Sequence, residues 1–190
     1  KLKKEKKIKI EFKNGELIAL NSKKDSPINI IRAIENIAKK YAIGRDIHVG
    51  DTIIGIKGRV AFEAAAPLII IKAHHLLEKH TLSKWQQFQK ESISSFYGML
   101  LHEGQYFDPV MRDIESFLSN SQKNVSGIVY LKLKPYSFDL EGIKSKNDLM
   151  SNEFGTYGEI NKNWNATDVK GFIKINANAG KIYHNLKKET

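Results

Sequence analysis

Apolar and polar residues alternate near the start of the chain. Residues 8–12 (IKIEF) and 16–20 (ELIAL) follow a two-residue apolar spacing, which is typical of strands with one buried face. Asn14-Gly15 lies between them, and this dipeptide readily adopts the positive backbone angles of a tight turn. The pattern predicts an antiparallel hairpin.

Four later segments have the apolar spacing of three and four residues that is typical of amphipathic helices. Ser26-Pro27 and Asp108-Pro109 each combine a capping residue with a proline suited to a first helical turn. The expected helices start at Pro27, Pro67, Thr81 or Ser83, and Pro109, and the first three end near Gly44, His80 and His102.

Two further strand pairs and two further helices are expected. Residues 47–63 are rich in β-branched side chains and interrupted by glycines, which predicts two short strands. Residues 124–134 and 137–143 alternate around Pro135-Tyr136 and predict an antiparallel pair. A short helix is expected after Asn147 and a terminal helix from Thr167 to Tyr183. Because strands and helices are segregated along the chain, the fold class is α+β, with antiparallel strand pairs, several packed helices and a C-terminal helix.

Composition supports a folded domain with a single core. The chain has 190 residues, 41% of them hydrophobic, and four prolines. The absence of cysteine excludes disulfides and thiolate chemistry and is consistent with a reducing, cytoplasmic location. The longest apolar stretch, residues 64–71, is far shorter than the about 20 residues of a membrane span. No membrane association is expected.

The net charge of +10 raises the possibility of a nucleic-acid partner. Five lysines against one glutamate give residues 1–7 a charge of +4, which predicts a flexible basic start before a domain over residues 8–190. The other charges are spread thinly, without interleaved aromatic residues. A stand-alone basic binding module, with nucleic acid as its partner, therefore remains the less favoured alternative.

Two polar clusters are candidates for chemistry. His74, His75 and Glu78 in HHLLEKH are helical neighbours that could share a metal ion, but a polar rim on an amphipathic helix explains them equally well. A second cluster could hold an acid–base pair, but helix capping and aromatic burial explain it better; its members are Tyr97, His102, Glu103, Tyr106 and Asp108. We expect no metal site and no catalytic residue.

The chain also lacks the short motifs of self-contained catalysts. It has no glycine-rich phosphate loop, no GxSxG, no HExxH and no GxxxxGKS. The residues alone therefore indicate a binding, capping or assembly domain.

Six segments resemble those of one enzyme family, in the same order and spacing from about Ile8 to about Tyr183. Residues 55–63 (GIKGRVAFE) resemble the GIKSRGVYE of argininosuccinate synthetases. The other five are AIGR (42–45), AHHLLE (73–78), LLHEGQYFDP (100–109), QKNVSGIVYLKL (122–133) and TDVKGFIKIN (167–176). The resemblance identifies the chain as the C-terminal domain of such an enzyme.

The resemblance implies a ligase of arginine biosynthesis. The family uses ATP with magnesium to adenylate the ureido oxygen of citrulline, after which the amino group of aspartate displaces AMP. The family's ATP-binding SGG.D.S loop has no counterpart here. ATP and Mg are thus expected mainly on an N-terminal domain, and this fragment is expected to be inactive alone, to cap the citrulline site and to form a homotetramer.

Five residues are implied in substrate binding. Phe62 aligns with a tyrosine and Gly50 with a glutamate that contact citrulline in the family, and Asp51 could replace that glutamate if the strand slipped by one position. Lys57 and Arg59 keep the basic positions of the KSR segment. Loss of a carboxylate and a hydroxyl favours a substrate whose amine is already neutral, so an N-acylated citrulline is the hypothesis.

Overall fold

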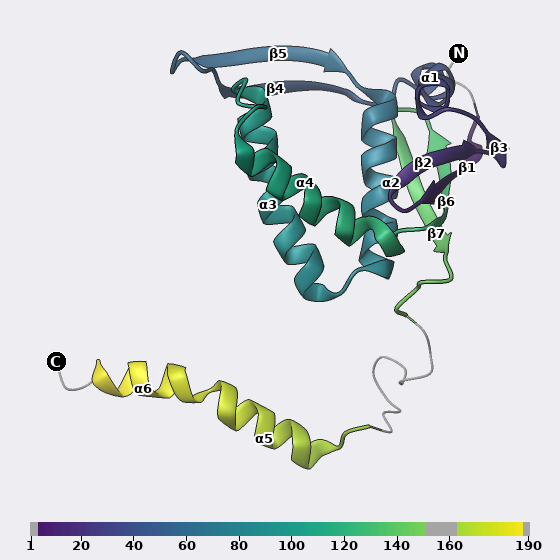
Figure 1. The fold of residues 1–190 in the computed structure, drawn as a ribbon. Coiled ribbons are helices and arrows are strands. Elements are labelled where there is room, and N and C mark those ends of the chain that lie inside the picture. Colours follow the sequence, from purple (N-terminus) through teal and green to yellow (C-terminus); the bar gives the residue numbers. More distant parts are fainter. Residues whose placement is uncertain (1–3, 151–162, 188–190) are drawn as a thin grey trace. The chain divides into compact units, whose positions relative to one another are not determined.

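A computed structural model describes residues 4–150 and 163–187. The chain separates into two compact units, Lys1–Leu149 and Met150–Thr190. The hydrophobic core of the described residues is a single cluster, and it lies in the first unit. The mixture of antiparallel strands and helices confirms the α+β class (Figure 1).

The first unit is built on a five-stranded antiparallel sheet with the order β3-β2-β1-β6-β7. The antiparallel pairs predicted for residues 8–20 and for residues 124–143 are both present. Asn14 and Gly15 take the expected positive φ angles of 51° and 80° in the turn between β1 and β2. The bounds are β1 Lys6–Lys13, β2 Glu16–Leu20, β3 Lys23–Lys24, β6 Gly127–Lys134 and β7 Ser137–Lys144. The pairing of β1 with β6 joins the two hairpins into one sheet.

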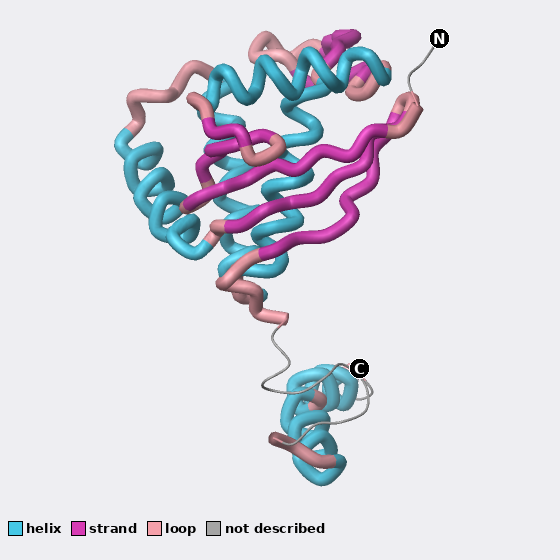
Figure 2. The backbone as a smooth tube through the Cα atoms, turned by 90° about the vertical axis from the view of Figure 1, so that its right-hand side faces the viewer, coloured by secondary structure: helices cyan, strands magenta, loops and turns pink. Residues whose placement is uncertain are grey.

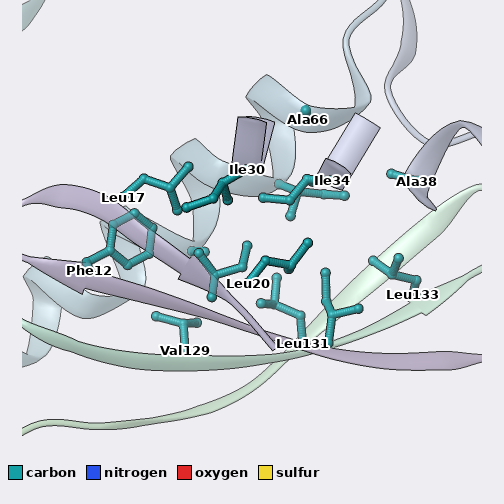
Figure 3. Close-up of a cluster of buried hydrophobic side chains, with 14 of the residues drawn as sticks. Phe12, Leu17, Leu20, Ile30, Ile34, Ala38, Ala66, Val129, Leu131 and Leu133 are labelled. Atoms are coloured by element: carbon teal, nitrogen blue, oxygen red, sulfur yellow. The ribbon is translucent and has the colours of Figure 1, made fainter. Parts of the chain in front are cut away.

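Helices α1 (Pro27–Ala38) and α2 (Ala65–Thr81) pack on one face of this sheet. In Figure 2, α1 runs along the top and α2 lies behind the strands. The alternating positions of β1 and β6 point into the core between the layers (Figure 3). The buried side chains there include Ile8, Ile10, Phe12, Ile30, Ile34, Ile69, Leu77, Val129, Leu131 and Leu133. The opposite face carries Lys7, Lys9, Tyr130 and Lys132, which are exposed or half-buried.

The first helix ends earlier than expected. After Ala38 the chain tightens into a 3-10 turn, η1 (Lys39–Tyr41), and Ala42 has a φ of 55°. This turn buries the ring of Tyr41 in the core and lets its hydroxyl donate to the Lys4 carbonyl oxygen over 3.1 Å. Gly44, the expected stop, instead permits a close approach, because a Cβ there would lie 2.6 Å from the Ala64 carbonyl carbon.

Helix α2 begins at Ala65, two residues before the expected proline. Pro67 is still in the first turn, where its missing N–H costs little. Ala64 supplies no side-chain cap, but Glu35 of α1 accepts a hydrogen bond from the backbone N–H of Ala66 over 2.9 Å. Its carboxylate also suits the positive end of the helix dipole. Glu35 therefore couples the start of α2 to α1.

The remaining elements of the first unit are a strand pair, two helices and a 3-10 turn. Ser83 caps α3 and forms a reciprocal capping box with Gln86, and Asp108 caps α4 as predicted. The strand pair is a separate two-stranded sheet. The bounds are β4 Arg45–Asp51, β5 Lys57–Glu63, α3 Lys84–His102, α4 Pro109–Ser121 and η2 Gln122–Asn124.

The second unit has two helices where one was expected, α5 (Ala166–Asn176) and α6 (Asn178–Leu186). Asn176, Asn178 and Gly180 are weak helix formers near the break at Ala177. The short helix expected after Asn147 does not begin before residue 150, and residues 151–162 lie outside the described part of the chain.

Core packing can be tested with two isoleucines of α1. Ile34 is fully buried and Ile28 is 61% exposed. Ile34→Ala is expected to lower the free energy of unfolding by about 2–5 kcal/mol, because it removes buried methyl groups and leaves a cavity. Ile28→Ala should change it by less than about 0.5 kcal/mol. Urea denaturation of both variants would contradict this packing if the two losses were equal.

Candidate functional site

The β4–β5 hairpin carries all five residues implied in substrate binding. Gly50 and Asp51 lie on β4, and Lys57, Arg59 and Phe62 lie on β5. The register pairs Gly50 with Gly58, Asp51 with Lys57, Val49 with Arg59 and Asp46 with Phe62. One ribbon therefore holds the whole set.

The pleat divides these residues between the two faces of the hairpin. Paired residues share a face and successive residues alternate, so Gly50 and Phe62 lie on one face, and Asp51, Lys57 and Arg59 lie on the other. The pairing of the two strands is regular along its whole length. The Asp51 carboxylate is paired with the Lys57 ammonium group at 2.6 Å.

A hollow of about 390 Å³ lies on the Gly50 side of the hairpin. His48 reaches over Gly50 there, since a Cβ on Gly50 would lie 2.5 Å from Nε2 of His48. His102, at the end of α3, lines the same hollow. Its other walls are Asp51, Thr52, Ile53, Ile54, Gly58 and Val60. We call this hollow the His48 pocket.

Sequence reasoning missed His48. The available signal was its spacing, because a residue two positions before Gly50 on a strand shares its face, and a glycine there leaves room for a large neighbour. His102 was named, but within a different cluster. Phe62 lines a separate hollow with Arg45, Asp46 and Glu63, so the structure does not bring Phe62 and Gly50 into one pocket.

The hairpin also exposes much apolar surface. Side chains on both faces and at the tip are between 41% and 78% exposed: Ile47, Val49, Ile53, Ile54, Ile56, Val60 and Phe62. An accumulation of exposed apolar side chains on one element is typical of interaction sites.

The histidine cluster of α2 surrounds a buried carboxylate. Glu78 is 2% exposed. It accepts hydrogen bonds from Nζ of Lys90 on α3 and from Nε2 of Gln122, each over 2.8 Å. Nδ1 of His74 and Nδ1 of His75 lie 3.6 and 3.7 Å from its oxygens. Glu78 thus connects α2 with α3 and with the turn before β6.

Burial favours the neutral form of His74, another member of this cluster. Its ring packs edge-on against Phe12, with the ring centroids 5.3 Å apart. Burial lowers the pKa of the His74 imidazole below its ordinary value of 6.5, although the neighbouring Glu78 carboxylate opposes that shift. The cluster therefore resembles a structural polar network.

The second polar cluster, around Tyr97 and Tyr106, makes structural contacts between helices. The Tyr97 hydroxyl donates to Glu115 over 2.8 Å, and the Arg112 guanidinium donates to the same carboxylate over 2.6 Å. Arg112 also lies 4.3 Å from the ring centroid of Tyr106. These contacts join α3 to α4, and the bond to Glu115 raises the pKa of the Tyr97 hydroxyl.

Among residues 4–150 and 163–187, no group of three or more histidine and acidic side chains is arranged to hold a metal ion. None of the helices in those ranges is both long enough and apolar enough to cross a membrane.

Comparisons with known proteins agree on one family. Residues 1–183 match the family described as "Arginosuccinate synthase C-terminal domain". The chain is 34% identical over 168 residues to the argininosuccinate synthase of Dehalococcoides mccartyi strain CBDB1, covering 88% of this chain and 41% of that protein. It is 32% identical over 181 residues to that of Methanocaldococcus jannaschii, covering 95% and 45%.

A third relative, the argininosuccinate synthase of Xanthomonas campestris pv. campestris, is 32% identical over 176 residues, covering 93% of this chain and 44% of that protein. The chain belongs to the argininosuccinate synthase C-terminal domain family. It spans less than half the length of these relatives.

The buried Glu78 gives a prediction about stability. Lys90→Met is expected to lower the free energy of unfolding by about 3 kcal/mol, because it removes the ammonium partner of a buried carboxylate. Lys7→Met is the control, since Lys7 pairs with Glu141 at 3.2 Å and its side chain is 75% exposed; its effect should stay below about 1 kcal/mol. Equal losses in chemical denaturation would show that Lys90 does not stabilise Glu78.

His74 gives a prediction about pH. Because its folded pKa lies below 6.5, the unfolded chain binds a proton first as pH falls, and its contribution to stability decreases below about pH 6.5. His74→Gln should remove that part of the decrease. The free energy of unfolding of both proteins, measured from pH 8 to pH 5.5, should therefore converge towards low pH; parallel curves would contradict the lowered pKa.

Proposed function

We propose that this chain is the part of an argininosuccinate synthase that covers the citrulline site and forms contacts between subunits of a homotetramer. The observation that carries the proposal is the β4–β5 hairpin, which forms a sheet separate from the core sheet and combines exposed apolar side chains with a hollow beside Gly50 that His48 and His102 line. A surface with both features suits a lid that excludes water from a substrate bound on a neighbouring domain.

The proposed reaction joins citrulline and aspartate with the use of ATP and Mg, as an ATP-dependent carbon–nitrogen ligase. The described residues do not fit a nucleotide and metal site, since they include no metal-binding group and the sequence has no glycine-rich phosphate loop. We therefore assign ATP and Mg to the part of the relatives that this chain does not cover, and assign substrate positioning and enclosure to this chain.

Phe62, Gly50, Lys57 and Arg59 are the proposed substrate-side residues, with Asp51 in support. Lys57 and Asp51 form an exposed ion pair across the hairpin. Arg59 is exposed and makes no ion pair within the described part of the chain. Its guanidinium is thus available for a carboxylate of the substrate or of a neighbouring domain.

The proposed substrate is an N-acylated citrulline. A free α-ammonium group needs an unpaired carboxylate or several acceptors when it is removed from water. The His48 pocket contains one carboxylate, that of Asp51, and it is already paired with Lys57. An acylated amine is uncharged and avoids that cost.

The apolar surfaces of α5 and α6 support the subunit contacts. Six large apolar side chains on these helices are between 59% and 73% exposed: Phe172, Ile173, Ile175, Ile182, Tyr183 and Leu186. Helices with exposed apolar faces gain stability by packing against another surface.

The activity can be tested with the full protein that carries this sequence. With ATP, Mg and aspartate, it is expected to release AMP when N-acetylcitrulline or citrulline is added, whereas the 190-residue chain alone should release none. The measurement is AMP by chromatography and the condensed product by mass spectrometry. Lack of AMP with every citrulline tested would defeat the proposed function, as would ATP turnover by the 190-residue chain.

A further inference from the structure

The His48 pocket contains few polar groups that remain free to bind a ligand. The Thr52 hydroxyl is engaged, donating to the Ile56 carbonyl oxygen over 2.7 Å and accepting from the Ile56 N–H over 3.3 Å. The Asp51 carboxylate is paired with Lys57. Of the described side chains that line the pocket, His48 and His102 are the polar ones without a hydrogen bond or ion pair.

The position of His48 is set by the glycine beside it. Its Nε2 occupies the space next to Gly50 where a side chain would begin, at 2.5 Å from an added Cβ. Gly58 lies opposite Gly50 in the register, so neither strand supplies a side chain at this point. Because residue 50 has no side chain, the exposed imidazole of His48 is the polar group at this part of the hairpin.

We propose that His48 is a specificity-determining residue, and that it binds the acyl amide of the substrate in the His48 pocket. This inference rests on the proposed function and deepens it, because it assigns the acyl group of the substrate to the His48 pocket. A neutral imidazole has one N–H donor and one acceptor nitrogen, which match the carbonyl oxygen and the N–H of an amide.

The walls of the pocket fit the rest of an acyl group. Ile53, Ile54 and Val60 line it from the hairpin and are 60% to 78% exposed, so an acyl methyl group would cover apolar surface that is otherwise in water. His102 adds a second imidazole from the end of α3, close to β4 in Figure 1. A volume of about 390 Å³ leaves room for an acetyl or a succinyl group.

The test compares two substrates in each of four full-length proteins. The measured quantity is the ratio of kcat/KM for N-acetylcitrulline to kcat/KM for citrulline, from AMP release with saturating ATP and aspartate. The ratio cancels any loss of folded protein, because both substrates meet the same preparation. The wild-type ratio is expected to exceed about 10, the effect of one unpaired charge or lost hydrogen bond.

The variants separate His48 from its surroundings. His48→Ala should lower the ratio about tenfold, because the amide loses its partner. His48→Ala combined with Gly50→Glu should bring the ratio below 1, because it adds a carboxylate for the ammonium group. Val49→Ala is the matched control: Val49 is the next residue on the same strand but lies on the opposite face, and its ratio should equal the wild-type value.

The outcomes distinguish this inference from the proposed function. A protein that turns over citrulline while its ratio is near 1, or is unchanged by His48→Ala, would overturn the role of His48 and leave the ligase activity standing. A protein that releases no AMP with either substrate would overturn both. A ratio that falls in His48→Ala and reverses in the double variant, with Val49→Ala unchanged, supports the inference.

Discussion

The fold of the first unit depends on the antiparallel pairing of β1 with β6. That pairing brings residues 6–12 against residues 127–133 and turns two local hairpins into one sheet. Its inward face presents Ile8, Ile10, Val129 and Leu131 at full burial or close to it. Without the pairing, neither hairpin would offer α1 and α2 a surface wide enough to cover.

The β4–β5 hairpin depends on the core in a different way. It is anchored at its base, where Gly44 permits close contact with Ala64 and where the Ala64 N–H donates to the Gly44 carbonyl oxygen over 2.9 Å. Beyond that anchor, pairing between β4 and β5 holds its shape, and its apolar side chains stay exposed. The hairpin is therefore fixed to the core at its base, while its own strand pairing holds the rest.

Much of this fold could be predicted from the sequence, because the informative signals were local. Asn14-Gly15, Ser26-Pro27 and Asp108-Pro109 each located a turn or a helix start correctly. The predicted end of α1 was wrong. Burial of Tyr41 is a tertiary effect, and it favours a tight 3-10 turn over a continued α-helix. The break at Ala177 was missed because apolar spacing continues through it, while the weak helix formers beside it decide the outcome.

The site was predictable only in part. Periodicity located the hairpin and resemblance selected its residues, but the division of those residues between two faces required the register. The spacing of His48 from Gly50 places both on one face of the strand, but only the structure shows that the His48 ring fills the space beside Gly50. The partners of Glu78 were also hidden, because Lys90 and Gln122 come from elements distant in sequence.

The ion pair between the buried Glu78 and the half-buried Lys90 has a consequence for how this sequence can change over time. Loss of Lys90 alone leaves a buried carboxylate without its ammonium partner, whereas a paired exchange to two well-packed apolar residues removes both charges together. Single substitutions at these two helix positions are therefore expected to be selected against. Homologous chains should keep both residues or replace both, and this coupling extends to Gln122, whose amide completes the shell around the same carboxylate.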